Sequence, residues 1–141
     1  MSKLADRLLV QLSQPEKTFE DFWKEYGLII KDKKPEAFWK KAFEKTTFSK
    51  NAIISRADIS YTYFYDILKG KKNPSRDVLI KICIAMELPV KTCQKALDAY
   101  DWAPLTATVR RDAILLYAIT HQLNLNDTQE LLEEHNLKAL W

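Results

Sequence analysis

The net positive charge of this chain is highest in its middle region. Residues 49–82 carry seven basic and three acidic side chains, whereas residues 1–48 carry ten and eight, and residues 83–141 carry five and eight. Ammonium and guanidinium groups bind phosphate in a salt-sensitive way, and hydroxyl groups can donate to phosphate oxygens. A basic stretch is also commonly just a solvated face. The predicted phosphate contacts are Lys50, Ser60, Lys69, Lys71, Lys72 and Arg76.

Four side chains between these cations have groups that can contact the bases of a nucleic acid: Tyr61, Thr62, Tyr65 and Asp66. A threonine can offer its hydroxyl to a base edge or its methyl to thymine, and an aspartate can accept from cytosine N4. The two tyrosines can also bond phosphates. The commonest base-specific contact is made by arginine to guanine, and no arginine is present here, so we expect weak discrimination between DNA sequences. Alternatively, these tyrosines and Tyr63 pack under other helices or at a protein interface.

The elements that must position these groups are two short helices joined by a tight link. Ser49 and Ser60 each precede a helix-like segment and can accept from its free N–H groups. Asp58 lies in the link and tolerates a left-handed backbone, and Gly70 ends the second helix. The inward apolar positions of the pair are Ile53, Ile54, Phe64, Ile67 and Leu68.

The other reactive side chains do not form a recognisable catalytic or metal-binding pattern. Cys83 and Cys93 lack the close spacing and histidine partners of a zinc site, so we expect buried, reduced thiols. His121 and His135 are far apart in sequence and have no adjacent nucleophile. We therefore expect no enzyme activity, no metal and no cofactor.

Three charged residues further along, Arg110, Arg111 and Asp112, allow two interpretations. They can form a second phosphate-binding pair at a helix start, or a structural ion pair that fixes the last helices of the chain. The second interpretation is favoured.

The rest of the chain also has helical periodicity and few helix breakers. It has only two glycines and five prolines, and no segment alternates convincingly enough for a strand, so the predicted fold class is all-α. The sequence Phe-Trp-Lys occurs at residues 22–24 and 38–40, which we interpret as two aromatic helices packing on a common core. Further helices are predicted over residues 3–13, from Thr18 to near Gly27, over 36–45, after Ser75, after Pro89 and over 110–122. A last helix is predicted from Asp127, with Glu130 in a capping box, to about His135. Residues 32–35 are predicted to be a break and residues 102–108 a loop.

Residues 49–100 resemble the lambda-repressor-like, XRE-type helix-turn-helix domain, a five-helix unit of bacterial and phage regulators. The matching positions are Ser49, Lys50, Ile53, Ile59, Ser60, Phe64, Ile67, Gly70, Pro74, Leu79 and residues 85–88. Ile54 departs from the small alanine of that family, and Asp58 departs from its turn glycine. The bulk of Ile54 must push the two helices apart or be absorbed elsewhere. Residues 111–114 and 131–132 look like the extra C-terminal helices of a Firmicute-type subset.

This resemblance implies three regions: N-terminal helices over residues 1–48, as an arm or part of the core; a helix-turn-helix domain over 49–100; and a helical extension over 101–141. It implies a sequence-specific DNA-binding transcriptional regulator. The alternative is a degenerate helix-turn-helix that serves as a protein-interaction module, an antirepressor or adaptor.

The expected partners are double-stranded DNA and a second copy of the chain, because one short helix reads too few base pairs. A protein partner is the alternative expectation. The C-terminal helices and Trp141 are the candidate dimer surface, although they can also be core. The longest apolar run near the start is far too short for a signal or membrane segment, so a cytoplasmic protein without membrane association is expected.

Overall fold

The computed structural model of the chain describes residues 3–29 and 35–141. The described residues form helices and no strands, which confirms the all-α prediction. The chain divides into two compact units, Met1–Lys33 and Lys34–Trp141, and each is described by itself. Of the predicted break over residues 32–35, all but Pro35 lies outside the described residues, and Pro35 begins a helix.

The first unit contains two short amphipathic helices, α1 (Lys3–Leu12) and α2 (Phe19–Tyr26). Thr18 opens α2 with a capping box, in which its side chain accepts from the Asp21 N–H while the Asp21 carboxylate accepts from the Thr18 N–H. Phe22 is the one buried side chain among the described residues of these two helices. Most of the apolar surface of both helices therefore faces solvent within this unit.

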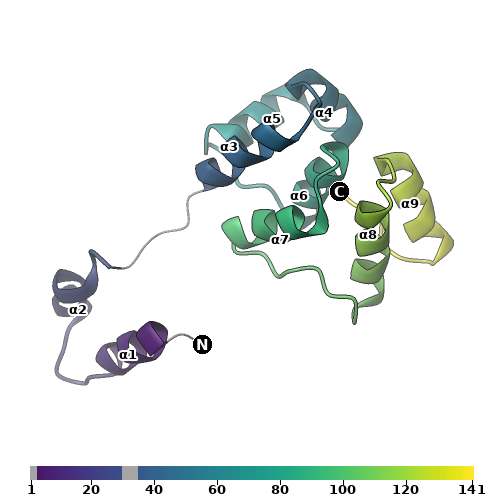
Figure 1. The fold of residues 1–141 in the computed structure, drawn as a ribbon. Helices are drawn as coiled ribbons and strands as arrows, with labels where there is room; N and C mark the ends of the chain where they lie inside the picture. The colour runs from purple at the N-terminus through teal and green to yellow at the C-terminus, as the bar shows by residue number, and fades with distance from the viewer. Residues whose placement is uncertain (1–2, 30–34) are drawn as a thin grey trace. The chain divides into compact units, whose positions relative to one another are not determined.

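The described residues of the second unit form seven helices (Figure 1): α3 (Pro35–Lys45), α4 (Lys50–Ala57), α5 (Tyr61–Leu68), α6 (Arg76–Ala85), α7 (Val90–Ala99), α8 (Arg110–Thr120) and α9 (Leu125–Glu134). Serines cap three of them, as predicted: the side chains of Ser49, Ser60 and Ser75 accept from the backbone N–H three residues later. The predicted start of the last helix at Asp127 is wrong. Asn124 is its cap and accepts from the Asp127 N–H at 2.8 Å.

The core of the second unit is built around α6, in which every residue from Val78 to Ala85 is buried. Helix α4 packs on α6, α3 packs on α7, and α8 packs on α9. Trp39 and Ala42 of α3 are buried in this core, so this helix belongs with the region that follows it. The two Phe-Trp-Lys helices, α2 and α3, belong to different units, and their packing on a common core stays a prediction.

The bulky Ile54 is accommodated at the edge of this core. It is half-buried and packs against the core cluster, whereas the fully buried small residue of α4 is Ala57, one turn later. The predicted steric conflict is therefore avoided, because Ile54 lies at the edge of the core.

Candidate nucleic-acid interface

Helices α4 and α5 are joined by a tight link whose backbone is held by local hydrogen bonds. Asp58, a residue type that tolerates a left-handed backbone, adopts that conformation with φ 52° and ψ 51°. The Ile59 N–H then donates back to the Ile54 carbonyl at 3.3 Å, which satisfies the end of α4. Ser60 caps α5 by accepting from the Tyr63 N–H at 3.1 Å. Asp58 closes one helix and Ser60 opens the next, so the direction of α5 is defined.

The four predicted base-contacting residues lie on α5, but they differ in exposure. Tyr61 is 60% exposed and Thr62 is also exposed, whereas Tyr65 and Asp66 are half-buried. The Tyr61 and Tyr65 rings pack against each other with centroids 4.4 Å apart and a tilt of 37°. On the opposite side of the helix, Phe64 and Ile67 are buried as predicted. The N-terminal end of α5 is the part of this helix most open to a ligand.

Four lysines lie at the ends of this helix pair and are exposed: Lys50, Lys69, Lys71 and Lys72. The Lys50 ammonium lies 5.2 Å from the Phe43 ring centre and 5.8 Å from that of Tyr65. The Lys72 ammonium lies 5.9 Å from the Tyr63 ring centre. Aromatic faces attract cations, so these two lysines are drawn toward the aromatic side of α5. Gly70 has φ 76°, and the Lys71 N–H bonds to the Asp66 carbonyl at 2.8 Å, which ends the helix between the lysines.

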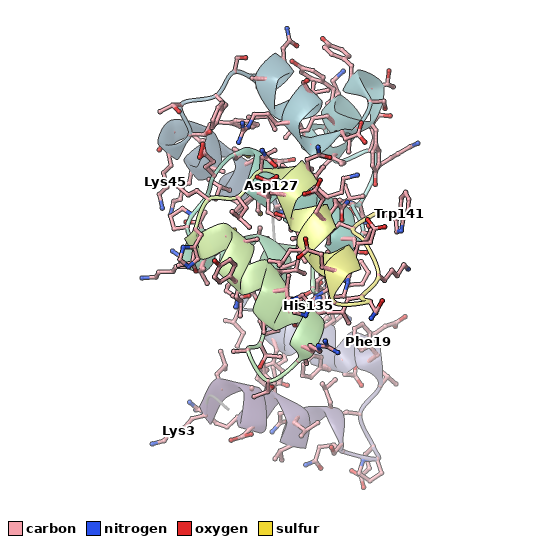
Figure 2. The ribbon with its side chains drawn as sticks, turned by 90° about the vertical axis from the view of Figure 1, so that its right-hand side faces the viewer. Lys3, Phe19, Lys45, Asp127, His135 and Trp141 are labelled. Carbon is pink, nitrogen blue, oxygen red and sulfur yellow. The ribbon has the colours of Figure 1, made fainter. Side chains whose placement is uncertain are left out.

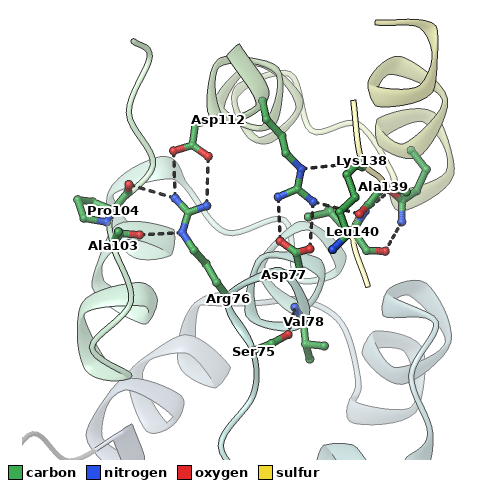
Figure 3. A network of polar contacts seen from close by, with 12 residues as sticks. Ser75, Arg76, Asp77, Val78, Ala103, Pro104, Asp112, Lys138, Ala139 and Leu140 are labelled. Carbon is green, nitrogen blue, oxygen red and sulfur yellow. Dashed lines mark hydrogen bonds and ion pairs between the residues drawn. The ribbon is translucent and has the colours of Figure 1, made fainter. Parts of the chain in front are cut away.

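Arg76 does not join these lysines, and its prediction as a phosphate contact is replaced by a structural role (Figure 3). Its guanidinium donates to both Asp112 carboxylate oxygens at 3.2 and 3.0 Å, and to the carbonyls of Ala103 and Pro104 at 2.9 and 3.1 Å. Four of its five donors are thereby used inside the protein. We leave Arg76 out of the interface.

Two of the three charged residues at the start of α8, Arg111 and Asp112, form the structural ion pairs that the sequence favoured, whereas Arg110 is exposed and lies 3.5 Å from His135 Nδ1. Arg111 donates to both Asp77 carboxylate oxygens at 2.9 and 3.0 Å, and to the carbonyls of Lys138 and Ala139 (Figure 3). Asp112 accepts from Arg76, as above. Sequence reasoning missed Asp77 as a partner, because the two residues lie 34 positions apart.

Two ionisable side chains of the second unit, Cys83 and Tyr100, have a raised pKa. Cys83 and Cys93 are buried free thiols, as predicted, and a hydrogen bond with Cys93 together with burial holds the pKa of Cys83 well above its ordinary value. Burial raises the pKa of Tyr100, partly opposed by the Trp39 indole N–H that donates to its hydroxyl at 2.7 Å. Among residues 3–29 and 35–141 there is no group of three or more metal-ligating side chains.

No protein-family model, no curated protein and no solved structure matches this chain. None of the helices in the described part of the chain is both long and apolar enough to cross a membrane.

Proposed function

We propose that this protein binds double-stranded DNA through α4 and α5, with α5 entering the major groove, and that it acts as a sequence-specific transcriptional regulator. The observation that carries the proposal is the combination of an exposed N-terminal end of α5 with exposed lysines at both ends of the helix pair. Helices α8 and α9 lie away from α5 (Figure 1), so they leave this face open.

In this proposal the residues of α5 differ in how much they contribute to base recognition. Tyr61 and Thr62 lie at the N-terminal end of the helix, where recognition helices place the side chains that contact base edges. Tyr65 and Asp66 lie one turn further along and are less exposed, so they contribute less to reading. Ser60 is committed to its cap, and its role in contacting phosphate is secondary.

The four lysines supply most of the affinity, because no arginine of α5 is available for a bidentate base contact. If each lysine neutralises one phosphate, the logarithm of the association constant falls with a slope of about −3.6 per logarithm of salt concentration for one protomer. Raising salt from 50 to 200 mM then weakens binding roughly 150-fold.

The test is a selection of bound fragments from random duplex DNA at two salt concentrations, followed by titrations of the selected fragment. Replacing Lys69, Lys71 and Lys72 by Glu is expected to abolish binding. The charge-matched control replaces Lys91, Lys95 and Lys138 by Glu; these lysines are also exposed but lie outside α4 and α5. Loss of binding in the control alone, or in neither variant, contradicts the proposal.

A second candidate function has one observation in its favour. The exposed Tyr61 ring packs on the half-buried Tyr65 ring to form an aromatic surface, and aromatic residues are enriched at protein interfaces. A protein-interaction module of the antirepressor or adaptor type would use this surface without the lysines. Absence of DNA binding at low salt, with retained folding, favours this candidate.

A further inference from the structure

The last two helical hairpins of the chain are copies of one unit. Residues 76–106 align with residues 111–141 at a constant offset of 35 without a gap. The identical pairs are Arg76 and Arg111, Asp77 and Asp112, Ile84 and Ile119, Leu88 and Leu123, Gln94 and Gln129, Leu97 and Leu132, and Leu105 and Leu140.

The backbone repeats with the same offset. The links inside the two hairpins place Glu87 and Gln122 in the left-handed conformation, with φ 54° and 52°. After each hairpin, a glutamine amide holds a leucine backbone through two hydrogen bonds: Gln94 with Leu105 at 2.7 and 2.8 Å, and Gln129 with Leu140 at 2.9 and 2.8 Å. The two hairpins are therefore similar in structure as well as in sequence.

The two hairpins face each other across an approximate two-fold axis. Arg76 of the first pairs with Asp112 of the second, and Arg111 of the second pairs with Asp77 of the first (Figure 3). Helix α6 packs on α9, and in the same way α7 packs on α8. Such reciprocal contacts define an isologous pair, in which each surface of one hairpin has an equivalent on the other.

One of these equivalent surfaces is covered on the first hairpin and open on the second. On the first hairpin this surface is covered by α4, which packs on α6, and by α3, which packs on α7. Leu79, Ile82 and Ala96 are buried there, and Trp39 of α3 donates its indole N–H to Tyr100. The corresponding residues of α8 and α9 line an open groove of about 320 Å³: Ala113, Ile114, Tyr117, Leu131 and His135. Tyr117 is 52% exposed, whereas its counterpart Ile82 is fully buried.

The chain contains a second copy of the motif that fills the first surface. Helix α3 carries Glu-x-Phe-Trp-Lys at residues 36–40, and α2 carries the same motif at residues 20–24. Trp39 of α3 is 4% exposed, but the equivalent Trp23 of α2 is 48% exposed. Trp23 stacks on Phe19, which is also exposed, so α2 presents an aromatic face of the kind that α3 buries.

We propose that the groove between α8 and α9 receives α2 of a second copy of this chain, and that the exchange is reciprocal. Trp23 then lies against His135 as Trp39 lies against Tyr100. The Arg110 guanidinium lies 3.5 Å from His135 Nδ1, and in the dimer the Trp23 indole N–H replaces it as the donor to that nitrogen. His135 lies at the C-terminal end of α9, at the end of the groove (Figure 2). The choice of a second copy rests on the proposed function, since a two-fold dimer supplies the two reading helices that a regulator of this type needs.

The first test measures the oligomeric state by sedimentation equilibrium in the absence of DNA. The wild-type chain is expected to dimerise, and Trp23→Glu and Tyr117→Glu are each expected to raise the dimer dissociation constant about 30-fold or more, as for an interface hot spot. Trp141→Ser is the control, since this exposed side chain lies outside the groove lining. A monomeric wild type, or a dimer disrupted by Trp141→Ser and not by Tyr117→Glu, overturns the proposal.

The second test separates exchange between copies from docking within one chain. Variants with one added cysteine beside the contact, Lys24→Cys and Glu134→Cys, keep Trp23 and Tyr117 in place, and both positions are exposed. The two variants are mixed under mild oxidation, and a cross-linked product of twice the chain mass is expected in the mixture. The native Cys83 and Cys93 are buried and interfere little. A double variant that cross-links only to monomer mass shows docking within one chain and overturns the proposal. Neither test involves DNA, so failure of DNA binding leaves both outcomes interpretable.

Discussion

The crossed ion pairs allow a quantitative prediction at Asp112. Its carboxylate accepts from two Arg76 nitrogens and from the Thr106 N–H at 3.1 Å, and its side chain is 7% exposed. In Asp112→Asn the guanidinium of Arg76 loses its counter-charge and faces an amide NH2 group while still largely buried. Removing one partner of a buried pair costs about 3–5 kcal/mol of unfolding free energy.

The pseudo-symmetric residue Asp77 is a matched control. Among the residues that the structure describes, Arg111 is its one hydrogen-bond donor, and its side chain is 19% exposed, so solvent can replace part of the lost interaction. Asp77→Asn is therefore expected to cost roughly 1–2 kcal/mol, between the values for exposed and buried pairs. Urea unfolding followed by circular dichroism and tryptophan fluorescence measures both costs.

A double variant identifies the cause of the loss. If the uncompensated Arg76 charge produces the cost, then Arg76→Met combined with Asp112→Leu recovers most of the stability that Asp112→Asn loses. Equal costs for the two asparagine variants, or less than about 1 kcal/mol for Asp112→Asn, would refute the reasoning from burial and bond number.

Three further predictions concern local chemistry. Because burial raises the pKa of Tyr100, the tyrosine proton is lost from the unfolded chain at a lower pH than from the folded chain. The stability that this proton contributes is present below pH about 10 and is lost as the pH rises above it. The difference in unfolding free energy between wild type and Tyr100→Phe should therefore shrink from pH 9 to 11. At the left-handed Asp58, Asp58→Gly should stabilise the protein by about 0.5–1 kcal/mol and Asp58→Val should destabilise it, as thermal unfolding can show. A hydrogen bond with Cys93 and burial raise the pKa of Cys83, and both thiols are buried. Ellman's reagent at pH 8 should therefore react with both thiols only as fast as the protein unfolds. Rapid reaction of the folded protein would contradict this.

The features that the sequence predicted correctly depend on neighbouring residues. A serine before a helical stretch, a left-handed turn residue and an apolar helix face are determined within a few positions, and Ser49, Asp58 and Phe64 behave as expected. The start of the last helix was wrong for an equally local reason. Asp127 is favourable both as a cap and in the first turn, and it occupies the first turn after Asn124.

The roles of the arginines could not be predicted, because their partners come from distant parts of the chain. Arg76 and Asp112 lie 36 positions apart, and nothing near either residue distinguishes an internal pair from a phosphate contact. The offset of 35 was visible in the sequence. It shows which hairpins correspond, but only the structure shows that the repeats exchange their ion pairs across a two-fold axis.

The same contacts change how the charge of the central region must be read. Of its seven basic residues, Arg76 is paired with Asp112, and Lys81 is 7% exposed. Arg56 donates to the Ala85 carbonyl at 2.8 Å and covers the Phe48 ring at 4.2 Å. Both arginines have planar, multidentate guanidinium groups and are used to fix backbone and carboxylates, while the compact ammonium groups of the four lysines remain in solvent. The salt dependence of DNA binding should therefore follow four charges per protomer and not seven, and a measured slope near −6 per protomer would mean that the internal arginine contacts open on binding.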